Sequence, residues 1–283
     1  MSSSNTKSTH QVLLLASFIT FFFILLPNKV HSSDRVSFDF RKFHQNQKDL
    51  TFIGNTSVSE AGVLRLNDVN QDGIPFPDTV GKALYGVPVH IWEGDRLASF
   101  ITTFSFSMEA PRPNLVSDGL TFFLAPPGLP QGRNGGYFGI FNDTVCRNSS
   151  QIVLVEFDTH GSPNNPWDPA FQHIGINVNC IRSVRLTRWD ARYHGEEATV
   201  MIWYNASIKT LTASLTYLSD ETRYIVSAEV DLKAILPEWV TVGFTGTLAS
   251  RWRETHDVAS WHFFSILEAN NNVALENIAR ASA

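Results

Sequence analysis

The chain has 283 residues, enough for one large domain or two small ones. Charged residues make up 17% of it, below the roughly 25% typical of soluble domains. The formal net charge is -5 and Lys and Arg form no long cluster, which argues against nucleic-acid binding. The 21 Phe and 7 Trp residues indicate a β-rich protein packed by aromatic side chains.

The N-terminus, residues 1–32, has the pattern of a secretory signal peptide. Lys7 precedes an apolar run from Val12 to Leu26, and small residues up to Ser32 follow it, so we expect the mature chain to begin at Ser33. The apolar run is shorter than the about 20 residues of a membrane span. A secreted or vacuolar protein is therefore expected, with a membrane anchor as the alternative.

Short runs of alternating apolar residues follow, with turn residues between them and almost no helical periodicity. This pattern predicts an antiparallel β-sandwich or barrel. We expect one domain at 33–268, one helical turn at Leu232–Leu236 before Pro237, and a tail or propeptide at 269–283. The predicted strands are Val36–Phe40, Leu50–Ile53, Val63–Leu66, Phe100–Met108, Gly119–Ala125, Thr199–Tyr204, Thr210–Tyr217, Ile225–Val230, Val240–Thr245 and Trp261–Ile266, in addition to the two runs discussed next.

Two further strand-like runs flank a polar loop between Val153 and Val178. Because side chains alternate along a strand, Glu156 and Asp158 share one face of the first run, roughly 7 Å apart. Phe157 then points to the opposite face.

If the two runs pair, the polar loop brings Asn165, Asp168 and His173 to the same carboxylates. Carboxylates so close repel one another unless a proton or cation lies between them. An oxygen-rich set suits calcium, and carboxylates with an imidazole suit manganese, so two ions sharing Asp158 and Asp168 are expected. The alternative is a strand that ends in a solvated acidic loop.

The chain has two cysteines, Cys146 and Cys180. Because a secreted protein folds in an oxidising compartment, we expect them to form one disulfide, with two buried thiols as the alternative. Their spacing fits no zinc site. Four sequons mark possible surface glycans, at Asn55, Asn142, Asn148 and Asn205.

Several motifs together resemble the legume (L-type) lectins over essentially the whole mature chain, and most closely the fucose-binding, anti-H members. They are SFDF (37–40), SDGLTFFLAP (117–126), GGYFGIFN (135–142), VEFDT (155–159), NPWDP (165–169), HIGINVN (173–179), LPEWVTVGFTG (236–246) and ETHDVASWHF (254–263). The resemblance implies a concanavalin A-like jelly-roll sandwich of two sheets. It also implies a carbohydrate-binding protein that uses Ca²⁺ and Mn²⁺.

The resemblance assigns the metal ligands individually. Its manganese ligands match Glu156, Asp158, Asp168 and His173, and its calcium ligands match Asp158, the His160 carbonyl, Asn165 and Asp168. The family usually has Asp where this chain has Asn177, but that residue is not a direct ligand, so we expect the metals to be retained.

The resemblance places the sugar on Asp118, on a backbone N–H of Gly135 or Gly136, and on Asn165. It also implies a cis peptide between Ser117 and Asp118. Since Asn165 serves calcium and sugar alike, the two should bind together. A turn residue before glycine is the plain alternative for Asp118.

The choice of monosaccharide is less determined. Arg133 precedes the glycines, as an arginine does in fucose-binding members, which favours L-fucose. A tyrosine and an arginine of those members align with Ala249 and Trp252, although Arg251 or Arg253 can replace the charge. Galactose-type and mannose-type sugars and chitobiose remain alternatives.

Three functions compete at this point: a metal-dependent lectin, a glycoside hydrolase on a similar sandwich, and a storage or interaction protein that no longer binds sugar. A hydrolase needs two free carboxyl groups flanking the bond. Here Asn165, Asp168 and His173 would make Glu156 and Asp158 metal ligands instead. A non-enzymatic lectin, a homodimer or homotetramer as is usual in the family, is the prediction.

Overall fold

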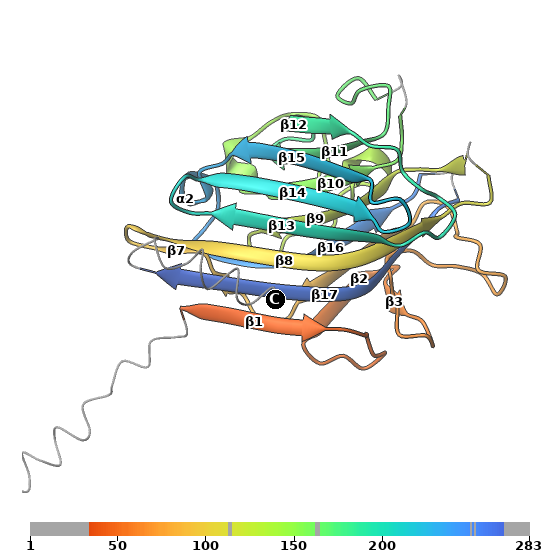
Figure 1. The fold of residues 1–283 in the computed structure, drawn as a ribbon, viewed down its shortest axis with the longest axis horizontal. Coiled ribbons are helices and arrows are strands. Elements are labelled where there is room, and N and C mark those ends of the chain that lie inside the picture. The colour runs from red at the N-terminus through yellow and green to blue at the C-terminus, as the bar shows by residue number, and fades with distance from the viewer. Residues whose placement is uncertain (1–33, 113–114, 162–164, 250, 252, 269–283) are drawn as a thin grey trace, which may run out of the picture. The chain divides into compact units, whose positions relative to one another are not determined.

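The computed structural model describes residues 34–112, 115–161, 165–249, 251 and 253–268. Strands dominate it, and they form two antiparallel sheets (Figure 1). The predicted signal peptide and C-terminal tail lie outside the described residues, as does Trp252. Among the described residues, no helix is both long and apolar enough to cross a membrane.

The first sheet contains the longest strands, β8 and β17, which run side by side for most of their length (Figure 1). Its order is β15 (Arg223–Glu229), β14 (Thr210–Tyr217), β13 (Ala198–Asn205), β8 (Arg96–Glu109), β17 (Thr255–Glu268), β4 (Leu64–Arg65) and β3 (Ser57–Val58), with β1 (Arg35–Phe40) paired to β17 and β7 (Trp92–Glu93) paired to β8.

The second sheet carries the predicted metal ligands near one edge. Its order is β12 (Ser183–Arg188), β11 (His173–Val178), β10 (Val153–Asp158), β9 (Gly119–Ala125), β16 (Trp239–Thr247), β5 (Val80–Tyr85) and β2 (Leu50–Gly54), with β6 (Val89–His90) paired to β16. A short helix, α2 (Leu232–Ile235), precedes β16.

The main core lies between the two sheets and is strongly aromatic. Phe104 of β8 contacts Phe122 of β9 and Phe244 of β16, with ring centroids 6.3 and 4.9 Å apart. Phe100, Phe104, Phe106 and Met108 all point inward, as their alternation predicts. A large buried aromatic surface of this kind stabilises a sandwich mainly through the hydrophobic effect.

A smaller apolar cluster covers the outer face of the second sheet. It joins Phe123 and Leu154 on the strands to Phe138, Ile140 and Phe141 on the segment that leads away from β9. Two 3-10 helices, η2 (Gly135–Tyr137) and η3 (Asn148–Ser150), lie along this segment. The cluster therefore fixes the loop that carries Arg133 and the glycines.

The predicted all-β sandwich, the position of Gly119–Ala125 inside a sheet and the helical turn before Pro237 are confirmed. The predicted disulfide is also present, between Cys146 and Cys180. Sequence reasoning missed β5, because Gly81 and the buried Lys82 interrupt its apolar pattern, and it missed the edge strand β12.

Candidate functional site

The site is built on the pairing of β10 with β11. Their antiparallel register sets Asp158 opposite His173 and Glu156 opposite Gly175. Phe157 points into the main core, so its neighbours Glu156 and Asp158 point to the other face. The predicted convergence of the two strands is confirmed.

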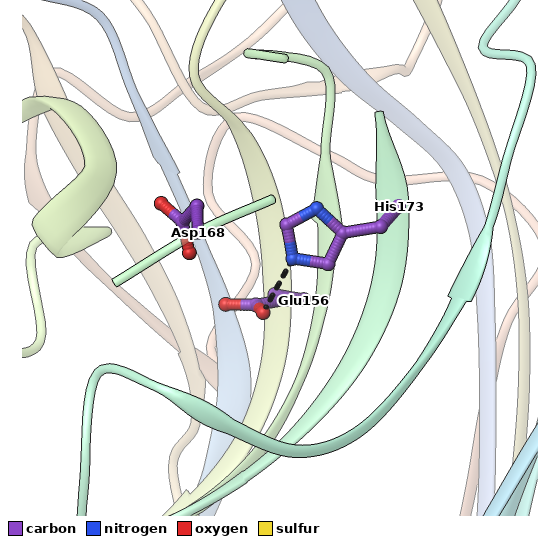
Figure 2. Close-up of side chains that lie close together, drawn as sticks. All are labelled: Glu156, Asp168 and His173. Atoms are coloured by element: carbon purple, nitrogen blue, oxygen red, sulfur yellow. Dashed lines mark hydrogen bonds and ion pairs between the residues drawn. The ribbon is translucent and has the colours of Figure 1, made fainter. Parts of the chain in front are cut away.

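Glu156, Asp168 and His173 form a compact cluster, in which one ligand atom from each lies within 4.8 Å of the others (Figure 2). His173 Nε2 is 3.0 Å from Glu156 Oε1. Gly175 makes room for this arrangement, since a Cβ there would lie 2.4 Å from Glu156 Oε1. Asp168 comes from the loop, and one of its carboxylate oxygens points toward Glu156 (Figure 2).

Asn177 supports the same cluster. Its amide donates to Glu156 Oε2 at 3.0 Å and to the Ile181 carbonyl at 2.7 Å. The Ser183 hydroxyl also donates to Glu156. Asn177 therefore places an uncharged amide donor beside the Glu156 carboxylate.

Asp158 lies beside this cluster but outside it. It is fully buried, its Oδ1 accepts from the His160 N–H at 2.5 Å, and its Oδ2 has no hydrogen-bond partner among the described residues. Burial, and then the charges of Asp168 and Glu156, raise the pKa of Asp158 well above its ordinary value. An unpartnered buried carboxylate oxygen is costly unless a cation or proton compensates it.

Asp168 is perturbed in the same way. Burial and the neighbouring Glu156 raise the pKa of Asp168 to about 7. Asn165 donates to Asp168 Oδ2 at 3.3 Å, so the side chains predicted to bind calcium lie together. Crowded acidic oxygens with one imidazole fit divalent cations of the calcium and manganese type. The identity of the ligands stays a prediction.

A cleft of about 330 Å³ lies next to these residues. It is lined by Asp118, Arg133, Asn134, Gly135, Gly136, Tyr137, His160, Asn165, Trp167, Ala249 and Arg251. Every predicted sugar-site residue that the structure describes is therefore in one cleft. Three polar or aromatic lining residues were missed: Asn134, Tyr137 and Trp167.

Asp118 lies at the base of this cleft, after a cis peptide bond with Ser117. It is 3% exposed, and its Oδ2 accepts from the Ala249 N–H at 2.9 Å. Burial is the main cause that raises the pKa of Asp118 to about 6. The segment after β16 is thus attached to Asp118 through the backbone N–H of Ala249.

The loop that carries Gly135 and Gly136 (the glycine loop) closely approaches the loop between β10 and β11 (the metal loop). A Cβ on Gly136 would lie 2.7 Å from Asn165 Nδ2, so only glycine leaves that amide in place. Gly135 has φ of +70° and its carbonyl accepts from the Thr247 hydroxyl at 2.9 Å. The glycine loop therefore lies close against Asn165 and is held to Thr247 by a hydrogen bond.

An aromatic stack forms one wall of the cleft. The Arg133 guanidinium carbon lies 4.4 Å from the Tyr137 ring centroid, and the Tyr137 and Trp167 centroids are 5.3 Å apart. Tyr137 and Trp167 stand inside the motifs GGYFGIFN and NPWDP, beside residues that were predicted. That adjacency was the signal available for them.

The four sequons differ in environment. The Asn55 amide donates to Asp68 Oδ2 at 2.6 Å, and its oxygen accepts from the Val80 N–H at 3.0 Å. Asn142 and Asn148 are exposed, and Asn205 is partly buried. Occupancy of all four stays a prediction.

Comparison with known proteins assigns the chain. Residues 35–278 match the model of the legume lectin domain. The chain belongs to the legume lectin family. These lectins are agglutinins, non-enzymatic proteins that bind carbohydrate, so the predictions of a lectin and of a protein without enzyme activity are confirmed.

Several legume lectins are similar over almost their full length. A bark leucoagglutinin of Maackia amurensis is 50% identical over 290 residues, which cover 99% of this chain and 100% of that protein. The structure of lectin I from Ulex europaeus with the methyl glycoside of α-L-fucose has a TM-score of 0.78 and 57% identity, covering 83% of this chain and 99% of that one. A galactose complex of the lectin UEA-II has the same TM-score and 48% identity, covering 82% and 99%.

Proposed function

We propose that this legume lectin binds its sugar only when calcium and manganese are bound. The observation that carries the proposal is the pair of raised carboxyl pKa values, at Asp158 and Asp168, beside an orphaned buried oxygen. Glu156, Asp158, Asp168 and His173 would hold manganese. Asp158, the His160 carbonyl, Asn165 and Asp168 would hold calcium.

The ions would supply positive charge that compensates these carboxylates and orders the loop between β10 and β11. The protein's own groups then contact the sugar: Asp118 accepts from sugar hydroxyls, the Asn165 amide donates, and a backbone N–H of Gly135 or Gly136 donates. The contact between Gly136 and Asn165 supports this assignment, since it joins the metal loop to the glycine loop.

L-Fucose is the proposed monosaccharide. Arg133 lines the same cleft as Asp118 and the glycines, and its guanidinium lies over the Tyr137 ring. The similar Ulex lectin binds a fucoside. The cleft also contains Ala249 in place of a tyrosine and Arg251 nearby, and a galactose complex is known for another similar lectin, so the test must include other sugars.

Cellular placement and assembly are also part of the proposal. The signal-like residues 1–32 and the similarity to a bark lectin support a secreted or vacuolar protein. A homodimer or homotetramer, as is usual in the family, would bind cell-surface glycans with avidity.

The test is a glycan-array screen of the purified mature protein with calcium and manganese, and again after EDTA treatment at mildly acid pH. Metal-dependent binding to fucosylated glycans is the expected result. Metal-dependent binding to another sugar class would refute fucose and retain the lectin. No binding with both metals demonstrably bound would refute sugar binding and favour a storage or interaction protein.

A further inference from the structure

The motif ETHDVASWHF contains two buried polar side chains that the proposed sugar and metal sites do not use, Glu254 just before β17 and His256 within it. Glu254 and His256 are both 0% exposed, and they connect to Thr159 and Asn67, each 1% exposed. Three segments far apart in the chain therefore meet in one chain of hydrogen bonds.

The donors and acceptors of this chain can be assigned. The His256 N–H donates to Asn67 Oδ1 at 2.8 Å, which fixes the orientation of the Asn67 amide. Asn67 Nδ2 then donates to His256 Nδ1 at 3.0 Å, so the His256 ring carries its proton on Nε2. That Nε2–H donates to Glu254 Oε2 at 3.0 Å.

Glu254 Oε2 accepts a second bond, from the Thr159 hydroxyl, at 2.6 Å. Glu254 Oε1 has no hydrogen-bond partner among the described residues. One oxygen atom of a buried carboxylate therefore receives two donors, one from the first sheet and one from the loop that follows β10. Hydrogen bonds to an ionised acceptor are stronger than neutral ones.

Thr159 stands between Asp158 and His160, two of the proposed calcium ligands. Its carbonyl is held as well, because the Gln172 amide donates to it at 3.0 Å. Gln172 directly precedes His173, so Thr159 is fixed to both ends of the metal loop. The hydroxyl bond to Glu254 adds the contact with β17.

We propose that Glu254 is a positioning residue for the calcium site, acting through the Thr159 hydroxyl. The inference rests on the proposed metal dependence. A buried carboxylate adds little net stability compared with an apolar residue of similar size, so its geometric effect on the loop is the function that the contacts support. Groups that hydrogen-bond directly to metal ligands typically change metal affinity by about 10–100-fold. Glu254 acts through Thr159, which neighbours two such ligands, so an effect at the lower end of this range is expected.

Four variants of the mature protein test this. Thr159→Val removes the hydroxyl and keeps the shape, and Glu254→Leu removes the acceptor. Glu254→Gln keeps an acceptor oxygen and removes the charge. Thr102→Val is the matched control, because the Thr102 hydroxyl is equally buried and hydrogen-bonded, to the His262 carbonyl at 2.8 Å, but lies in the first sheet.

Calorimetric titration with calcium should show about tenfold weaker affinity for Thr159→Val and Glu254→Leu. The double variant should lose no more calcium affinity than Glu254→Leu alone, because both substitutions remove the same Thr159–Glu254 hydrogen bond. The calcium affinity of Glu254→Gln should stay within about threefold of that of the parent, because Gln keeps an acceptor oxygen. Thr102→Val should lower the melting temperature of the metal-free protein without changing calcium affinity.

Parental calcium affinity in Thr159→Val would overturn the inference, and so would an equal loss in Thr102→Val. This result does not depend on Glu254→Leu folding. Sugar binding is measured separately on the parent, so a parent that binds calcium but no sugar refutes the proposed lectin activity and leaves the role of Glu254 to be decided by the calcium titrations.

Discussion

Replacing Asp118 by Asn should remove sugar binding and yet stabilise the metal-free protein. Asp118 is 3% exposed, and burial is the main cause that raises its pKa from the ordinary 3.8 to about 6. The hydrogen bond that its Oδ2 accepts from the Ala249 N–H, at 2.9 Å, needs only an acceptor oxygen. Asn can supply that oxygen, but it cannot accept sugar hydroxyls on both side-chain atoms.

The magnitude follows from the pKa of Asp118. One pKa unit corresponds to about 1.4 kcal/mol, so the rise from 3.8 to about 6 amounts to about 3 kcal/mol. Because the folded-state pKa is raised, the favourable contribution is fully present below about pH 3.8 and is lost as the pH rises through about 6. At pH 7.5 the charged Asp118 therefore destabilises the metal-free fold by about 3 kcal/mol.

The assay is urea and thermal unfolding of the EDTA-treated parent and the Asp118→Asn variant across pH. At pH 7.5 the variant should be more stable by about 3 kcal/mol, which corresponds to about 6–12 °C in melting temperature. At pH 4 the difference should shrink to about 0.5 kcal/mol.

Asp220→Asn is the control with the opposite sign. Asp220 is an exposed carboxyl, and hydrogen bonds from Thr222 and Arg192 lower its pKa to about 2. Its contribution is present at neutral pH and lost as the pH falls through about 2, so Asp220→Asn should not be stabilised at pH 7.5. If Asp118→Asn is destabilised at pH 7.5, or if its advantage does not depend on pH, the burial argument is refuted.

Three further predictions concern neighbouring parts of the structure. Gly136→Ala puts a Cβ 2.7 Å from Asn165 Nδ2 and so displaces the amide that is proposed to donate to the sugar. The sugar affinity, measured by calorimetry, should fall at least about tenfold, which corresponds to the loss of at least one hydrogen bond. An unchanged affinity would contradict the proposed contact. Because the pKa of Asp168 is about 7, protons should compete with the metal for this carboxylate. Metal affinity should therefore weaken at least about tenfold between about pH 7.5 and 5.5. A metal affinity that does not change with pH would argue against Asp168 as a ligand. Replacing Cys146 and Cys180 by Ser, 34 residues apart in sequence, should lower the free energy of unfolding in urea by about 3–4 kcal/mol, and an unchanged midpoint would show that the bond constrains little.

The clustering of the candidate metal residues could be predicted because the argument needed only local information. Alternation along one strand put Glu156 and Asp158 on the same face, and strands that follow one another in sequence often pair, as β10 and β11 do. The separation of Asp158 from the compact cluster could not be predicted, because it depends on a side-chain bond to the His160 N–H.

The aromatic wall of the cleft was missed for a different reason. Tyr137 follows β9 and Trp167 follows β10, and their contact depends on how two loops fold over the outer face of the second sheet. Neither residue has a periodic partner in sequence that would indicate it. The strands β5 and β12 were missed because buried Lys82 and the arginines of β12 obscure the apolar alternation.

The sequence by itself determined the all-β class, the inward faces of the strands and the family, and it indicated the candidate residues for metal and sugar. Each of these follows from a period of two residues or from a contiguous motif. The tertiary structure decided which of these residues meet. Thr159 and Glu254 are 95 residues apart, and Asp118 and Ala249 are 131 apart. Such contacts are set by the order of strands in two packed sheets, which no local pattern encodes.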